Sequence, residues 1–104
     1  MSKRKFYLFI FLFVFFLGNS GIAKDNYFDE GKKLFDEKKF LESKFKFEQA
    51  IVFNPKNERS YLYLAKIFKQ EEKDNLEEQN LKTVILLNPQ NEEALYLLTL
   101  LKIK

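Results

Sequence analysis

The stretch of sequence that decides the fold is IVFNPKNE at residues 51–58, which recurs as ILLNPQNE at residues 85–92. Pro55 in the first copy corresponds to Pro89 in the second, an offset of 34 residues that we call the repeat period. Periods of about 20–50 residues are typical of proteins that stack one small structural unit several times. A single unit cannot bury its own apolar face, and its neighbours cover that face instead.

The sequence on either side of this stretch predicts pairs of helices. Apolar or small residues lie three or four positions apart in residues 27–35, and the pattern returns in residues 61–68. This spacing forms one face of a helix. Pro55 ends the helix before it, because a helix seldom continues through the residue that precedes proline. Asn57 then suits the N-cap of the next helix.

We therefore expect helices near residues 25–37, 40–53, 58–71, 74–87 and 92–103. No segment alternates apolar and polar residues between turn signals, so the sequence predicts an all-α fold. Gly31 and Ala65 occupy equivalent positions in the two copies. We expect both at close helix crossings, where a larger side chain would force the helices apart.

In this pattern the chain resembles the tetratricopeptide repeat family, whose unit reads W-x₂-L-G-x₂-Y, A-x₃-F and a closing P, with a period equal to the one found here. The matching positions are Tyr27, Gly31, Leu34, Ser43, Phe47, Ala50, Pro55, Tyr61, Ala65, Phe68, Glu77, Leu81, Val84 and Pro89. The resemblance implies a short right-handed α-solenoid with hairpins at 24–57 and 58–91. Residues 92–104 would add a C-terminal capping helix, a partial third unit.

Two departures from the family pattern have local consequences. Glu30 and Glu77 place carboxylates where the family has small or apolar residues. Residues 71–75 contain no glycine, so we expect a looser turn in the second hairpin than the family usually has.

The resemblance also implies a function, because family members hold a peptide or helix of another protein on a concave face lined by the first helix of each unit. We therefore expect a non-enzymatic protein–protein interaction module. Its predicted concave face consists of Phe28, Lys32, Phe35, Asp36, Arg59, Leu62, Tyr63, Lys66, Lys69, Tyr96 and Leu100. Cationic and aromatic side chains together favour an acidic or amphipathic partner segment. The alternative is an ordinary amphipathic surface with no partner.

One family subtype uses a Lys, Asn and Arg clamp to bind a C-terminal carboxylate. Phe28 and Lys32 stand where that subtype has Lys and Asn, so we do not expect this kind of ligand.

Two further regions suggest self-association as an alternative function. Leu41, Phe45 and Val52 share one outward side of the predicted helix 40–53, which is an apolar stripe unless the chain's own ends cover it. The helix 92–103 is apolar nearly all round. We expect Leu95 and Leu98 to pack on the second unit. One hairpin cannot fully cover the other apolar residues of this helix, which would then pair with a second copy of the chain or with a partner's helix. These residues are Leu97, Leu100, Leu101 and Ile103.

Residues 1–23 have the pattern of a secretory signal peptide. Three basic residues precede an apolar run at 6–17, and Gly21-Ile22-Ala23 has the small–x–small form of a cleavage site. As a helix the run would be about 18 Å long, against roughly 30 Å for a bilayer core. We expect cleavage after Ala23 and an exported, periplasmic or envelope-associated protein. The alternative is an inner-membrane anchor formed by residues 6–17.

Composition excludes several classes of function. The chain has no Cys and no His, so disulfides, thiolate nucleophiles, imidazole bases and the usual zinc sites are absent. Residues 24–104 contain 15 basic and 15 acidic residues, which argues against nucleic-acid binding. Gly31 is the only glycine in that range, so it has no glycine-rich phosphate loop. We expect no catalytic residue, no cofactor and no metal, and a partner that is a protein or a second copy, with membrane contact only if the signal is retained.

Overall fold

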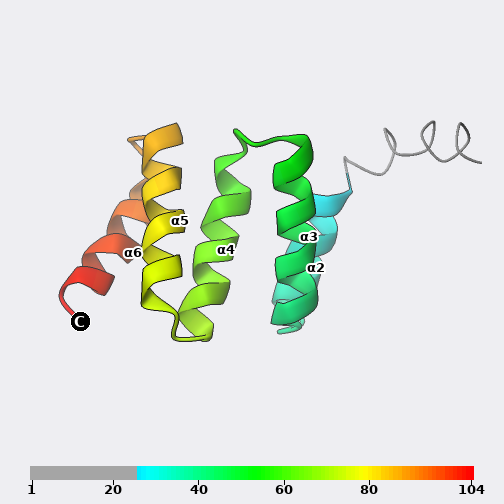
Figure 1. Cartoon of the computed structure of the whole chain (residues 1–104), viewed down its shortest axis with the longest axis horizontal. Helices are drawn as coiled ribbons and strands as arrows, with labels where there is room; N and C mark the ends of the chain where they lie inside the picture. The colour runs from blue at the N-terminus through cyan, green and yellow to red at the C-terminus, as the bar shows by residue number, and fades with distance from the viewer. Residues whose placement is uncertain (1–25) are drawn as a thin grey trace, which may run out of the picture.

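The computed structural model describes residues 26–104, and the predicted signal segment lies outside that range. The described residues form an all-α fold of five helices without a strand (Figure 1). This confirms the predicted fold class. The helices are α2 (Tyr27–Asp36), α3 (Phe40–Phe53), α4 (Glu58–Gln70), α5 (Asp74–Leu87) and α6 (Glu92–Lys102).

The helix ends follow the signals found in the sequence. α3 and α5 have the predicted bounds. α2 begins two residues later and ends one residue earlier than predicted, and α4 and α6 each end one residue earlier. The side chain of Asn57 accepts a hydrogen bond from the Arg59 N–H at 3.1 Å and so caps α4. Asn91 caps α6 in the same way, since its side chain accepts from the Ala94 N–H at 2.9 Å. Side-chain oxygens at N-caps satisfy backbone donors that the helix itself leaves free.

The repeat of the sequence is also a repeat of the backbone. The first and last residues of α3 and α5 are offset by the repeat period, and so are the first residues of α4 and α6. Consecutive helices pack against each other and run in opposite directions, so that α2 pairs with α3 and α4 with α5 (Figure 1). α6 packs on α5 beyond the second pair.

The turns inside the two hairpins have the same conformation. Lys38 and Glu72 are equivalent in the repeat, and they are the two non-glycine residues with positive φ in the described range, at 63° and 57°. The N–H groups of Lys38 and Lys39 donate back to the end of α2, and those of Glu72 and Lys73 donate to the end of α4 in the same pattern. This pattern is a Schellman cap. The expectation of a looser turn at 71–75 is wrong, because Glu72 takes the left-handed conformation that glycine usually supplies.

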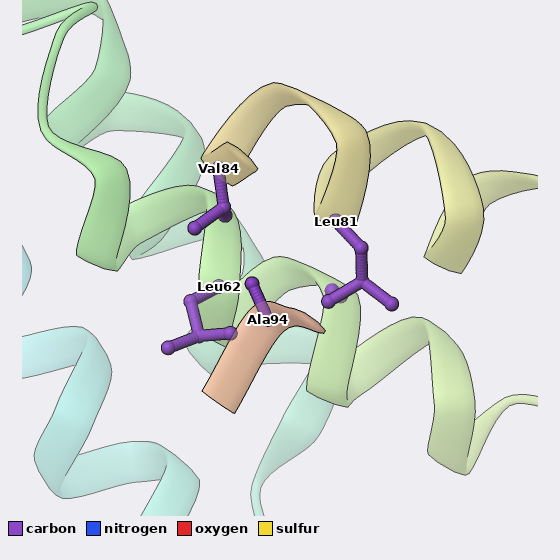
Figure 2. Packing of buried hydrophobic residues seen from close by; sticks show 5 residues of the cluster. Leu62, Leu81, Val84 and Ala94 are labelled. Carbon is purple, nitrogen blue, oxygen red and sulfur yellow. The ribbon is translucent and has the colours of Figure 1, made fainter. Parts of the chain in front are cut away.

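The core is divided between the hairpins. Figure 2 shows Leu62 of α4, Leu81 and Val84 of α5, and Ala94 of α6 packed together, with Ala65 in the same cluster. A second cluster joins the first hairpin to α4 and contains Phe47, Leu64 and Ile67.

Gly31 lies at a close helix crossing, as predicted. A Cβ atom at this position would stand 2.9–3.0 Å from the ring of Phe47, which is fully buried. The hydroxyl of Ser43, also fully buried, donates to the Gly31 carbonyl at 2.7 Å. Glycine is therefore required here by the closeness of α3, and one side-chain hydrogen bond fixes the contact.

Candidate functional site

Three aromatic residues of the predicted concave face, Phe28, Phe35 and Tyr63, pack where α2, α3 and α4 meet. The Tyr63 ring lies 5.8 Å from that of Phe28 and 5.1 Å from that of Phe35, both edge-on. It also stacks on Phe47, with centroids 4.9 Å apart. Edge-to-face and offset-stacked pairs at these distances are favourable beyond the area that they bury. Phe28, Phe35 and Tyr63 are half-buried, so they hold the helices together and offer only part of each ring to the surface.

Cationic side chains lie over these rings. The Arg59 guanidinium carbon is 4.5 Å from the centre of the Phe28 ring, and the Lys66 Nζ is 5.0 Å from that of Tyr63. Cations over aromatic faces are attracted by the ring quadrupole. Arg59 remains exposed, whereas Lys66 is half-buried and also pairs with the Glu93 carboxylate on α6. The structure thus brings α2, α4 and α6 together through one polar and aromatic surface.

Lys32 and Lys69 complete the cationic part of this surface. Both are exposed, and neither forms an ion pair within residues 26–104. Asp36 and Tyr96 are exposed as well, and Leu100 is half-buried. Glu93 is a surface residue that the sequence analysis missed. It stands one repeat period after Arg59, so the repeat register could have placed it on the same face.

Leu62 does not belong to the accessible surface. Its side chain is 7 % exposed and packs against Leu81, Val84 and Ala94 (Figure 2). The prediction that Leu62 is offered to a partner is therefore wrong. Leu62 sits at the border between the predicted concave face and the side of α4 that receives the next two helices, and those helices cover it.

The apolar stripe predicted on the helix 40–53 is exposed in the structure. Leu41, Phe45 and Val52 are 72 %, 65 % and 77 % exposed, as expected for an outward apolar stripe. Leu86 on α5 is the repeat equivalent of Val52 and is 82 % exposed. Exposure of this stripe is confirmed, and its use as a contact surface stays a prediction.

Of the two α6 residues predicted to pack on the second hairpin, Leu98 does so and Leu95 does not. Leu97 packs with Leu98 on the α4–α5 cluster, and Leu101 is half-buried, whereas Leu95 is exposed. The helical pattern locates the apolar residues of α6 but does not say on which side the preceding hairpin lies. The repeat register does, because Leu97 and Leu98 correspond to Tyr63 and Leu64.

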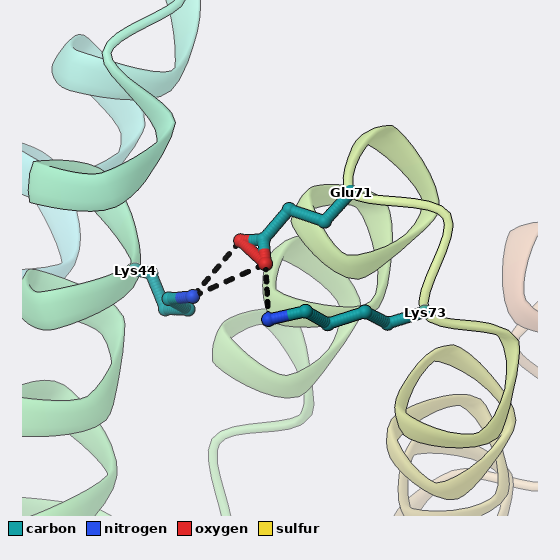
Figure 3. A network of polar contacts seen from close by, with 3 residues as sticks. All are labelled: Lys44, Glu71 and Lys73. Atoms are coloured by element: carbon teal, nitrogen blue, oxygen red, sulfur yellow. Dashed lines mark hydrogen bonds and ion pairs between the residues drawn. The ribbon is translucent and has the colours of Figure 1, made fainter.

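A polar network ties the first hairpin to the turn of the second. The Lys44 Nζ on α3 donates to both carboxylate oxygens of Glu71, at 2.9 and 3.3 Å, and the Lys73 Nζ lies 2.9 Å from Glu71 Oε2 (Figure 3). The hydrogen bonds from Lys44 and then from Lys73 hold the pKa of Glu71 below its usual value. Its charged form is therefore favoured, and the network fixes the angle between the hairpins.

A small cavity of about 110 Å³ at the α4–α5–α6 junction contains another carboxyl group whose pKa is shifted, that of Glu77. Its lining residues are Lys69, Glu77, Leu100, Leu101 and Lys104. Glu77 is 3 % exposed, and burial raises the pKa of its carboxyl group while Lys69 and Lys104 partly offset the effect. The other lining side chains are those of two lysines and two leucines, so Glu77 is the one acidic residue among those that line the cavity.

Two findings bear on other classes of site. Within residues 26–104, no group of three or more Asp or Glu side chains is placed to hold a metal ion. No helix of that part of the chain combines the length and apolar character that crossing a bilayer requires.

Comparison with known protein-family models and with curated proteins gave no match to this chain.

Proposed function

We propose that the chain is a non-enzymatic protein-interaction module of the tetratricopeptide type, with hairpins at 24–57 and 58–91 and a partial third unit at 92–104. The observation that supports it is the period shared by sequence and backbone. Several features recur at this spacing: both bounds of α3 and α5, the first residues of α4 and α6, the N-cap asparagines and the left-handed turn residues. A common period in sequence and backbone favours a stacked repeat over an irregular helix bundle.

The proposed partner is an acidic or amphipathic peptide or helix of another protein, bound on the predicted concave face. Four cations stand on this face, Lys32, Arg59, Lys66 and Lys69, against the carboxylates of Asp36 and Glu93. The half-buried rings of Phe28, Phe35 and Tyr63 supply apolar area between the charges. A cationic surface with aromatic patches speeds encounter with an acidic segment and gives its apolar side chains a place to pack.

The proposal places this module in the cell envelope, on the basis of the signal pattern in residues 1–23. N-terminal sequencing of the native protein should then begin at Lys24. A native chain that begins at Met1 and sediments with membranes would support the anchored alternative instead.

The binding face is tested by a matched pair of charge reversals. One variant carries Lys32→Glu and Arg59→Glu, both on the predicted concave face and both exposed. The control carries Lys33→Glu and Lys56→Glu, two exposed cations outside this face that likewise have no ion pair in the described range. Both variants change the net charge equally. Lys66 is left in place because its pair with Glu93 joins α4 to α6, and Lys69 because it lies beside the buried carboxyl group of Glu77.

We expect proteins captured from envelope extracts by the parent to bind the concave-face variant at least about tenfold more weakly, mainly through slower association. The control should capture them as the parent does. Circular dichroism should show equal helicity in all three proteins. Equal capture by both variants would place the binding site elsewhere on the molecule.

A further inference from the structure

The outer side of α6 is apolar and exposed in the structure. Leu95, Tyr96 and Ile103 are 42 %, 63 % and 75 % exposed, and Thr99 between them is exposed too. Positions three or four apart on a helix share one side, so these four side chains form a single surface. We call it the α6 outer face.

The repeat shows what this face is suited to. Leu95, Tyr96 and Thr99 are the repeat equivalents of three residues of α4, Tyr61, Leu62 and Ala65. In α4 these positions receive α5 and α6, and there Leu62 is 7 % and Ala65 1 % exposed. The α6 outer face therefore occupies the positions at which α4 packs against other helices, but on α6 these side chains are exposed to solvent.

The spacing on this face is symmetric about Thr99. Leu95 and Ile103 each lie four positions from it, and Tyr96 and Lys102 each lie three. Thr99 itself has the position of Gly31 and Ala65, the small residues at close crossings. A helix with such spacing can cross an antiparallel copy of itself at the central small residue, with equal contacts on the two sides.

The charges at the ends of α6 favour the same arrangement. Glu92 and Glu93 begin the helix, and Lys102 lies in its last turn, with Lys104 two positions beyond. Within the chain Glu93 pairs with Lys66, Lys102 with Glu78 and Lys104 with Asp74. The charges open to a second copy are therefore Glu92, which forms no ion pair in the described range, and Lys102, whose side chain is 58 % exposed. In an antiparallel pair the acidic end of one helix lies beside the basic end of the other. In a parallel pair like charges would meet, which is destabilising.

We propose that the α6 outer face binds a second copy of the chain, with the two α6 helices antiparallel and crossing at Thr99. Leu95 of each copy packs on Ile103 of the other, and Tyr96 lies beside Lys102 of the other. The helix of 11 residues is about 16 Å long, too short for the roughly 1,200–2,000 Å² of a permanent interface. The dimer is therefore concentration-dependent. It goes beyond the proposed partner binding and shares only Tyr96 with that surface.

The chain has no cysteine, so disulfide trapping can test this crossing directly. Thr99→Cys places a thiol at the proposed twofold axis, and Gln79→Cys places one at an exposed position of α5 as a control. Full-length chains are oxidised mildly at equal concentrations and separated without reductant. We expect at least about fivefold more disulfide dimer from Thr99→Cys. Residues 1–25 are the same in both variants, so association through that segment would raise both yields alike.

Two combined variants, each carrying Thr99→Cys and changes at Leu95 and Ile103, test the orientation of the helices. Thr99→Cys combined with Leu95→Lys and Ile103→Lys should give no more dimer than the control, because antiparallel copies then bring lysines together. Thr99→Cys combined with Leu95→Lys and Ile103→Glu should keep the dimer, since each lysine then meets a glutamate. Both side chains are exposed, so neither combined variant should lower helicity.

Equal dimer yields from Thr99→Cys and Gln79→Cys would overturn the proposal. So would loss of the dimer in both combined variants alike. A disulfide between a Thr99→Cys chain and a Lys33→Cys chain, without one between two Thr99→Cys chains, would indicate head-to-tail stacking and would also overturn it. The charge reversals on the predicted concave face leave α6 unchanged, so the two proposals can fail separately.

Discussion

The two hairpins share a backbone but fill it differently. At the crossing of the first hairpin, Gly31 faces Phe47, and at the equivalent place in the second, Ala65 stands with Leu81. Phe47 and Leu81 are both fully buried. The first hairpin thus combines the smallest residue with a large ring, and the second adds a methyl group and takes a smaller side chain. The two crossings therefore hold a similar total side-chain volume, although the residue types differ.

A polar position beside this crossing also differs. Ser43 donates to the Gly31 carbonyl, and Glu77 stands in its place in the second hairpin. Both residues are buried, but Ser43 is neutral and hydrogen-bonded, whereas the carboxyl group of Glu77 is desolvated and has a raised pKa. A buried hydroxyl with a partner stabilises the fold, and a buried carboxylate without one costs stability when it is charged.

The largest effect is expected from Gly31→Ala. The added Cβ would lie 2.9–3.0 Å from the Phe47 ring, which is enclosed and cannot move away freely. We expect a loss of about 1–3 kcal/mol in the free energy of unfolding, measured by urea denaturation followed by circular dichroism.

The control for this prediction comes from the second hairpin. Gly31→Ala together with Phe47→Leu recreates the Ala65–Leu81 pair in the first hairpin and should recover part of the loss. If the double variant is less stable than the sum of the two single changes predicts, the crossings are not equivalent in volume.

The next largest effect concerns the network at Glu71. We expect Glu71→Gln to lower stability at pH 7 by about 1 kcal/mol, since it removes charge-assisted bonds from Lys44 and Lys73 that are only partly exposed to water. The equivalent residue Glu37 pairs only with Lys39, in an exposed position. Glu37→Gln should therefore cost less than about 0.5 kcal/mol.

The effect of Glu71 should depend on pH in a defined direction. The pKa of Glu71 is lowered in the folded protein, so its contribution is present above the ordinary value of 4.5 and is lost as pH falls through the folded value. Parent and Glu71→Gln should thus differ at pH 7 and converge in acid. A constant difference from pH 7 down to pH 2 would contradict this assignment.

Glu77 should show the opposite pH dependence with a smaller amplitude. Burial raises the pKa of Glu77, so the stabilising neutral form is fully present below 4.5 and is lost as pH rises through the folded value. Glu77→Gln removes the cost of the charge and should raise the urea midpoint at pH 7, with no difference near pH 3. Lys69 and Lys104 limit the gain, because they already offset part of this cost. Glu42→Gln, at an exposed position, serves as the control.

The smallest effect is expected at the two turns. Lys38 and Glu72 hold a left-handed conformation that is unfavourable for residues with a Cβ, so Lys38→Gly and Glu72→Gly should each stabilise the protein by about 0.5–1 kcal/mol. Equal gains would show that the turns are equivalent in energy as well as in geometry. Lys82→Gly, in the interior of α5, should instead destabilise by about 1 kcal/mol.

The sequence predicts the helix bounds well because they depend on local signals. Pro55 and Asn57, with their second copies, fix where helices end and begin. The exposed and buried sides of the helices depend on non-local packing, and there prediction was weaker. Leu62 and Leu95 were each assigned to the wrong environment, because a helical wheel gives angles around one axis but not the directions of its neighbours.

The ion pairs were less predictable still. Lys44 and Glu71 lie 27 residues apart, and no local pattern connects them. Their contact depends on how one hairpin is set against the next, which only the assembled helices determine. Comparison of the two repeat copies, position by position, would have recovered the environment of Leu97, the equivalent of Tyr63, but neither that of Leu62 nor this contact.

The order of the helices has a kinetic consequence. Within residues 26–104, the extensive helix–helix contacts join neighbours in the chain, α2 with α3, α3 with α4, α4 with α5 and α5 with α6. Only short loops have to close, so we expect folding within milliseconds. α6 packs mainly on α5 and should exchange its amide hydrogens faster than α4, which has a neighbour on each side. The α6 outer face then has its defined shape only while α6 is packed on α5. The fraction of molecules in which α6 is packed sets an upper limit on the fraction that can bind through this face.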